Sequence, residues 1–226
     1  MKLGVLFSGG KDSCLAMRRA EGKIVCLITV VSKNPESYMF HTPNVHLTKL
    51  QAEAIGLPLV SVNTEGKKEE ELKDLAEAIS EAKEKYGIEG VVTGAVESVY
   101  QSSRIAKICD ELGLACVNPL WKKEPRELLD ELLKEGFKVI ISGVFAPPLD
   151  RSWLGKELDK EMVRKLLALK ESHGISPVGE GGEIETTVLD APFFSKRIEV
   201  VQKDVFEEKN SAVLIIRKAR LAKKEI

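Results

Sequence analysis

The chain has 226 residues, 43% hydrophobic and 31% charged, which is enough apolar material to fold around a sizeable core. Its 34 lysines and arginines nearly balance 35 aspartates and glutamates, for a formal charge of -1. The balance argues against a nucleic-acid-binding protein, which needs a basic excess. The apolar runs are too short for a signal peptide or a membrane span, so we expect a cytoplasmic protein with no membrane partner.

The first half of the chain alternates short apolar runs with helical patterns. The run at 24–31 is almost wholly apolar and rich in β-branched residues, as in a parallel strand covered on both faces. The pattern therefore predicts a doubly wound α/β domain over residues 1–120 with a five-stranded parallel sheet. We expect its strands at 3–7, 24–31, 59–62, 91–93 and 115–117, and its helices at 12–19, 47–54, 68–86 and 105–112.

The pattern loosens in the second half. Four leucines between 128 and 133 predict a helix, and a strong strand is expected at 138–145. A further helical pattern runs from 158 to 169, and a glycine-rich turn follows at 179–182. Strands are expected at 198–205 and 212–216, so residues 121–226 are predicted to form a second, smaller α+β domain.

Four cysteines are present, Cys14, Cys26, Cys109 and Cys116, and none belongs to a C-x-x-C pair. Zinc and iron–sulfur sites need clustered thiolates. We therefore interpret all four as small reduced hydrophobes.

A polar, glycine-containing turn separates the first expected strand from the first expected helix. It reads Ser8-Gly9-Gly10-Lys11-Asp12-Ser13, and we call it the phosphate loop. Two glycines let the backbone approach a ligand, and the N–H groups at a helix start form an anion site. Asp12 fits among phosphates if it orients the loop or holds Mg²⁺. On these residues alone, a structural turn with Asp12 as helix cap is an equal alternative.

A second motif follows the fourth expected strand and runs from Gly94 to Arg104. Ligands of open α/β sheets bind outside the carboxyl ends of the strands, so Gly94 should border the same crevice as Ser8. Tyr100 and Arg104 are four residues apart and should share a helix face. Arg104 suits phosphate or carboxylate binding, although a helix cap and a surface arginine would leave the same pattern.

Two clusters in the second half also carry polar chemistry. One contains Trp153 within Asp150-Arg151-Ser152-Trp153-Leu154-Gly155-Lys156. The other brings together Glu180, Glu183 and Glu185, which could bind Mg²⁺, neutralise a cation or act as a base. An edge strand with exposed acids would give the same residues.

The phosphate loop resembles the S-G-G-x-D-S signature of the PP-loop family, the N-type ATP pyrophosphatases. That resemblance implies an adenine-nucleotide alpha-hydrolase-like sheet and cleavage of ATP between its α and β phosphates. It implies nucleotide contacts from Ser8, Gly9, Gly10, Lys11, Asp12, Ser13 and Gly94, with Asp12 as a ligand of Mg²⁺.

Four motifs in order resemble one branch of that family, the diphthine–ammonia ligases. They are S-G-G-K-D-S, G-A-x-x-S-x-Y-Q-x-x-R, the segment Asn118-Pro119-Leu120-Trp121, and G-E-x-G-E-x-E-T. The chain departs from the usual pattern at Ile184, where the branch has Phe, and at Ser176, where Asn is frequent.

That resemblance implies amidation of diphthine, a modified histidine on elongation factor 2. The substrate carboxylate would be adenylated by ATP and then attacked by ammonia derived from ammonium. Lys11, Asp12 and Arg104 would be catalytic. The substrate would contact Tyr100, Gln101, Arg104, Trp153, Glu180, Glu183 and Glu185. We further expect the three glutamates and Trp153 to receive the quaternary ammonium group of diphthine through charge and cation–π attraction.

Two other readings of the sequence stay open. One is a tRNA-modifying PP-loop enzyme, which a basic patch on one face would favour. The other is a non-enzymatic nucleotide-binding module, which would not release AMP. The sequence leaves the oligomeric state undetermined, and a homodimer is one candidate.

Overall fold

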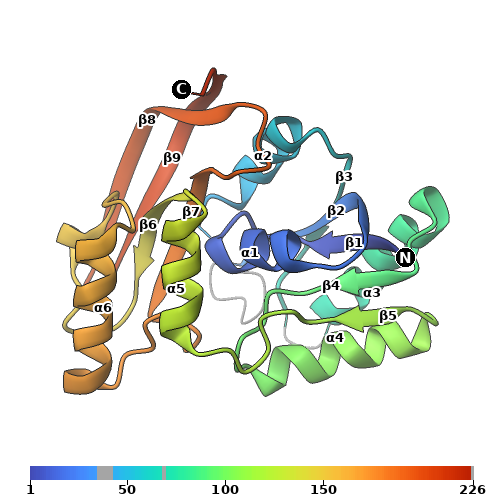
Figure 1. Cartoon of the computed structure of the whole chain (residues 1–226), viewed down its shortest axis with the longest axis horizontal. Helices are drawn as coiled ribbons and strands as arrows, with labels where there is room; N and C mark the ends of the chain where they lie inside the picture. The colour runs from blue at the N-terminus through green and yellow to red at the C-terminus, as the bar shows by residue number, and fades with distance from the viewer. Residues whose placement is uncertain (35–42, 68–69, 225–226) are drawn as a thin grey trace.

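The larger of two sheets is five-stranded and parallel (Figure 1), as predicted. The structure is a computed structural model that describes residues 1–34, 43–67 and 70–224. The strand order β3-β2-β1-β4-β5 places β1 at the centre, and the chain direction across the sheet reverses between β1 and β4. A crevice forms outside the carboxyl ends of strands at such a switch point. The strands are β1 (Lys2–Leu6), β2 (Lys23–Ser32), β3 (Leu59–Thr64), β4 (Gly90–Val92) and β5 (Ala115–Val117).

Helices cover both faces of this sheet, as doubly wound topology requires. Strand β2 shows why, because Leu27 packs with one set of helices and Ile28 with the other. Helices α1 (Lys11–Arg19) and α2 (Thr48–Ile55) cover one face, while α3 (Glu71–Tyr86) and α4 (Val99–Glu111) cover the other. Residues 68 and 69, where we expected α3 to begin, lie outside the described part. None of the described helices is long and apolar enough to cross a bilayer.

The second sheet is antiparallel, with the order β7-β6-β9-β8. This arrangement confirms the expected α+β character of the second half. Strands β8 and β9 extend beyond the expected ranges because they pair along nearly their whole length. Polar residues at their ends therefore also belong to strands, since each is paired with a residue of the other strand. The elements are α5 (Pro125–Lys134), β6 (Lys138–Val144), α6 (Lys160–His173), β7 (Ile184–Asp190), β8 (Arg197–Glu208) and β9 (Ser211–Ala222), with short 3-10 turns η1 (Val45–Leu47) and η2 (Arg151–Trp153).

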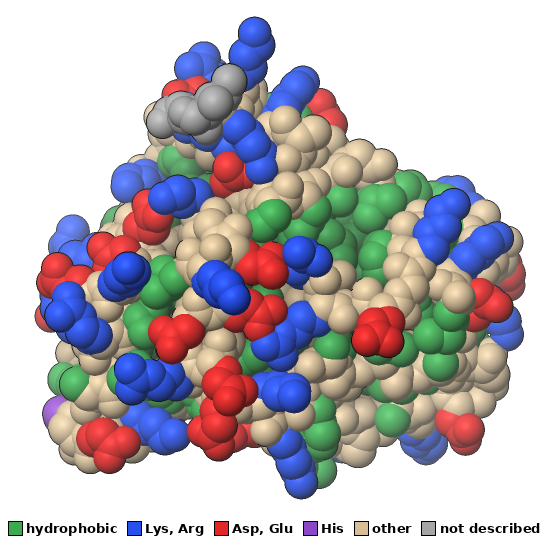
Figure 2. Space-filling view, viewed as in Figure 1, with side chains coloured by type: hydrophobic (Ala, Val, Ile, Leu, Met, Phe, Trp, Pro, Cys, Tyr) green, Lys and Arg blue, Asp and Glu red, His purple; other side chains and the backbone are tan. Residues whose placement is uncertain are grey.

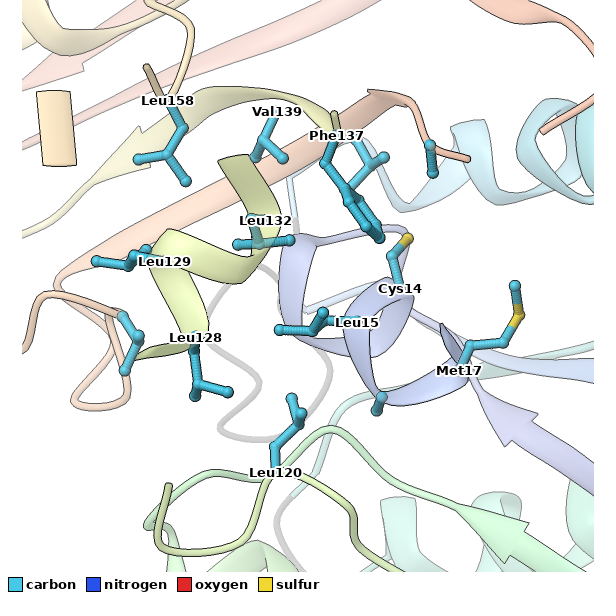
Figure 3. Close-up of a cluster of buried hydrophobic side chains, with 14 of the residues drawn as sticks. Cys14, Leu15, Met17, Leu120, Leu128, Leu129, Leu132, Phe137, Val139 and Leu158 are labelled. Atoms are coloured by element: carbon cyan, nitrogen blue, oxygen red, sulfur yellow. The ribbon is translucent and has the colours of Figure 1, made fainter. Parts of the chain in front are cut away.

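Helix α1 joins the two halves through one hydrophobic core (Figure 3). Leu15 of α1 is fully buried and faces α5, where Leu128 and Leu132 are also buried. Arg19 Nε donates to Glu131 Oε1 of α5 at 2.8 Å, beside this contact. We propose that the expected boundary between residues 120 and 121 falls in the β5–α5 connection. Helix α1 then packs against the parallel sheet of the first half and against α5 of the second half.

Replacing Leu15 by Ala should lower the free energy of unfolding by about 2–5 kcal/mol, because it leaves a cavity between α1 and α5. Urea denaturation followed by circular dichroism measures the change. Val99→Ala is the control, since that side chain is 67% exposed and should change stability by less than about 0.5 kcal/mol. Equal effects of the two substitutions would contradict this description of the core.

Candidate functional site

A cavity of about 540 Å³ lies at the switch point of the parallel sheet. The phosphate loop and the start of α4 form part of its wall, and the segment 178–186 before and within β7 forms another part. Apolar residues of β1, β2, α3 and α4 complete it: Leu6, Ile28, Val30, Leu75 and Ile105. Its polar lining includes Ser8, Lys11, Asp12, Ser13, Ser98, Gln101, Glu180, Glu185 and Thr186. The cavity therefore combines an apolar part with a charged part, as a site for a nucleotide requires.

The phosphate loop is held from outside by close backbone packing. Gly9 has a φ of +78°, and a Cβ there would lie 2.1 Å from Oε1 of Gln51. The buried Gln51 amide donates from Nε2 to the carbonyl oxygens of Gly9 and Val188, both at 2.9 Å. At Gly10, a Cβ would come within 3.3 Å of the Thr186 carbonyl oxygen. The approach of α2 therefore requires glycine at position 9, and the approach of β7 leaves little room for a side chain at position 10.

Hydroxyl groups brace the loop internally. Ser8 Oγ donates to Ser13 Oγ at 3.3 Å, and Ser13 Oγ donates to the Gly10 carbonyl oxygen at 3.0 Å. Helix α1 begins directly after Gly10, so its positive dipole end faces the cavity. This is the arrangement by which helix N-termini bind phosphate groups.

Lys11 is a buried cation on the cavity wall. Its side-chain Nζ donates to the Val178 carbonyl oxygen and to Asp12 Oδ2, the latter at 2.8 Å. Its backbone N–H donates to Oγ1 of Thr186 at 3.2 Å. These contacts fix the ammonium group in the cavity before any ligand binds, which limits the entropy lost on binding.

Two carboxylates face this cation in the cavity. Burial raises the pKa of Asp12; Lys11 opposes the shift, and the charge of Glu180 adds to it. Burial likewise raises the pKa of Glu185 to about 7, with Lys11 lowering it and Asp12 raising it. A cation bound next to both carboxylates would therefore lower their pKa values, because it would favour their ionised forms.

The carboxylates of Asp12 and Glu185 fit the way proteins bind Mg²⁺, which is usually held by one or two carboxylates together with substrate phosphates and water. Within residues 1–34, 43–67 and 70–224, no three His, Cys, Asp or Glu side chains gather into a ligand set for a metal ion. A divalent ion here would thus depend on the phosphates of the nucleotide.

The connection between β4 and α4 is packed directly against the start of α1. A Cβ at Gly94 would lie 2.9 Å from the Asp12 carbonyl carbon and from the Ser13 nitrogen. On the same wall, Glu180 Oε1 accepts hydrogen bonds from the backbone N–H groups of Val96, Glu97 and Ser98. Gly94 therefore borders the phosphate loop, as expected from the sequence.

Other expected site residues are placed differently. Arg104 and Tyr100 share a face of α4, with the guanidinium carbon 3.5 Å from the ring centroid, but neither lines the cavity. Trp153 lies in η2 and packs against the main core, also away from the cavity lining. Glu183 Oε1 accepts from the Ser176 N–H at 3.1 Å. Of the four residues expected to receive a cation, Glu180 and Glu185 line the cavity, whereas Glu183 and Trp153 do not, and Oε1 of Glu180 is engaged by three backbone N–H groups.

Sequence reasoning missed Gln51 and the contacts of the segment 178–188 with the phosphate loop. A signal for Gln51 was present, because this polar residue follows Leu47 by four positions and so lies on the buried face of the expected helix. The contacts of Val178 and Val188 are made by backbone groups, which leave no signature in residue type.

A parallel sheet with a glycine-containing loop and a helix N-terminus at its switch point defines an α/β nucleotide-binding protein. The model of the diphthamide synthase N-terminal domain matches residues 1–116, and that of the diphthamide synthase C-terminal domain matches residues 124–222. The chain belongs to the diphthine–ammonia ligase family.

Three relatives named diphthine--ammonia ligase illustrate the similarity. The Rattus norvegicus protein is 40% identical, over 88% of this chain and 83% of its own length. The proteins from Bos taurus and Homo sapiens are 37% and 36% identical, each over 91% of this chain and 85% of their own length. A solved structure titled as a predicted subunit of tRNA methyltransferase from Methanocaldococcus jannaschii has a TM-score of 0.42 and 20% identity, over 84% of this chain and 98% of that one. That similarity is too low to bear on function.

Replacing Glu185 by Gln should stabilise the protein at pH 8. Because the folded pKa is about 7 against an ordinary 4.5, the wild type loses stability as pH rises between these values. The variant should avoid that loss and gain roughly 1–3 kcal/mol at pH 8, with a smaller gain at pH 5. Thermal and urea unfolding at both pH values measure it, with the exposed Glu171→Gln as control. An equal or larger gain at pH 5 would show that Glu185 is not held in this environment.

Proposed function

We propose that this chain is an AMP-forming, ATP-dependent ligase that converts diphthine on elongation factor 2 into its amide with ammonium. The observation that carries the proposal is one cavity in which a phosphate loop faces a carboxylate-bearing segment of the second half of the chain. Its relatives at 36–40% identity are named as diphthine--ammonia ligases.

The phosphate end of ATP is proposed to lie at the phosphate loop and the start of α1. Lys11 and the helix N-terminus there stabilise negative charge as pyrophosphate leaves. Leu6, Ile28, Val30, Leu75 and Ile105 would surround the apolar adenine ring. Gly94 and Ser98 complete the wall on the side of α4. Bound Mg²⁺ would supply charge neutralisation on the phosphate oxygens, with Asp12 as the side chain that holds it.

The reaction consists of two displacements. The diphthine carboxylate attacks the α-phosphate, and the bond to pyrophosphate breaks. Ammonia then attacks the acyl carbon, and the bond to AMP breaks. A fixed cavity accelerates both steps mainly by holding the reacting groups together and by matching the charge that develops.

Glu185 is the side chain that we propose faces the cationic part of the substrate. Its carboxylate lines the cavity close enough to Lys11 and Asp12 for their charges to act on its pKa. A trimethylammonium group or an incoming ammonium beside it would keep it ionised at neutral pH. Gln101 lies on the same cavity, and we keep Tyr100 and Arg104, which neighbour it on α4, as proposed substrate contacts. The proposal does not extend to Trp153.

Surface charge supports a protein substrate over tRNA. On the face shown in Figure 2, Lys and Arg side chains are interspersed with Asp and Glu, and no extended basic patch covers it. The near-zero formal charge of the whole chain agrees with this distribution. A tRNA-binding surface needs clustered positive charge along the backbone contacts.

The proposal predicts that the protein, ATP and ammonium together amidate diphthine-bearing elongation factor 2. Mass spectrometry of the factor should show conversion of a carboxylate to an amide, and chromatography should show AMP as the nucleotide product. Asp12→Asn should lower the rate at least about a hundredfold, since it removes the charge expected to hold the metal. Glu171→Gln, on the exposed face of α6, should react at the wild-type rate. Formation of ADP, or no change in the factor, would refute the proposal.

A further inference from the structure

One carboxylate oxygen of Glu180 holds the start of α4. Oε1 accepts hydrogen bonds from the N–H groups of Val96, Glu97 and Ser98 at 3.0, 2.8 and 2.7 Å. The acceptor precedes β7 in the second half of the chain, while the three donors connect β4 to α4 in the first half. We call this contact the Glu180 latch.

The latch is a strong contact on general physical grounds. Three successive N–H groups that converge on one point form a concave site for an anion, and the start of a helix adds its dipole. Hydrogen bonds to a charged acceptor are about twice as strong as bonds between neutral groups. The protein's own carboxylate thus fills the anion site at α4, which leaves the start of α1 as the place for the phosphates.

The turn that presents Glu180 is itself fixed. Gly179 has a φ of +73°, and a Cβ there would lie 2.5 Å from the Ile184 carbonyl oxygen. The Gly182 N–H donates to the Gly179 carbonyl oxygen at 2.9 Å, and the Glu180 N–H donates to Ser176 Oγ at 3.3 Å. The carboxylate is therefore delivered by a braced turn and not by a freely moving loop.

The Glu180 latch fixes the wall of the cavity that is formed by α4 and the residues before it. Ser98 caps α4 by accepting from the Gln101 N–H at 3.4 Å. Gly94, Ser98 and Gln101 all line the cavity, and Gly94 packs on the first turn of α1. A shift of the α4 start would move these three residues together.

We propose that Glu180 is a positioning residue, which holds the α4 wall of the nucleotide cavity in place from the second half of the chain and does not contact the substrate itself. This inference rests on the proposed function for its kinetic consequence. Its structural consequence, the protection of three amides, is independent of any activity.

The test compares Glu180→Gln and Glu180→Ala with Glu171→Gln, which removes the same charge from an exposed helix. Hydrogen–deuterium exchange at the amides of residues 96–98 should accelerate at least about tenfold in both Glu180 variants, because both remove the charged acceptor of three hydrogen bonds. Binding of a non-hydrolysable ATP analogue should weaken by a similar factor. Affinity for diphthine-bearing elongation factor 2 should stay within about twofold of the wild type, since Glu180 is proposed not to contact that substrate.

Sodium formate provides a rescue, because a small carboxylate can enter the site that Glu180→Ala leaves open. Formate should restore amide protection and part of the analogue affinity in that variant, whereas sodium chloride at equal ionic strength should not. Unchanged exchange at residues 96–98 would overturn the proposal, and so would a loss confined to affinity for the protein substrate. If the wild type bound no ATP analogue, the proposed function would fail while the exchange experiment still decided on the latch.

Discussion

The cavity depends on the hydrogen bonds between the phosphate loop and the segment 178–188. The Val188 N–H donates to the Gly9 carbonyl oxygen at 3.0 Å, and Lys11 is bonded to Thr186 and Val178. A buried backbone group without a partner is costly, so these bonds make the loop and the segment stable only together. Neither half of the chain forms the site alone, and one hydrophobic core likewise runs through α1 and α5.

The segment 178–188 also supplies negative charge to the site. It brings Glu180 and Glu185 to a wall that already carries Lys11 and the start of α1, so positive and negative groups lie within one cavity. Carboxylates repel the phosphates of ATP unless a cation lies between them, so these side chains fit Mg²⁺ bound with the nucleotide or a cationic substrate. A site that takes both a polyphosphate and a cationic substrate needs both signs, and here Lys11 and Asp12 pair directly at 2.8 Å. Membership of the diphthine–ammonia ligase family is what favours a ligase over a simple nucleotide sensor.

The sequence predicted the first half of the fold well because its local pattern is strong, whereas β7 in the second half was not among the expected strands. Apolar runs such as 24–31 are unambiguous for parallel strands, and the stripe through Leu75, Ile79 and Ala82 became the buried face of α3. The site was predicted less completely. Gly94 was expected beside the phosphate loop from the rule for open sheets, and the structure has it there. The role of Glu180 was not predictable, because its partners are three backbone groups more than 80 residues away. Trp153 was expected at the site because tryptophan can bind a cation, but in the structure it packs against the core.

In the proposed reaction, the carboxylate of the substrate is adenylated in the cavity between the phosphate loop and Glu185. Diphthine-bearing elongation factor 2 carrying a heavy-oxygen isotope in its diphthine carboxylate tests this claim most directly. After reaction with ATP and ammonium, the account predicts one labelled oxygen in the phosphate of AMP for each amide formed. Release of that labelled oxygen into inorganic phosphate or into water, with none in AMP, would contradict it.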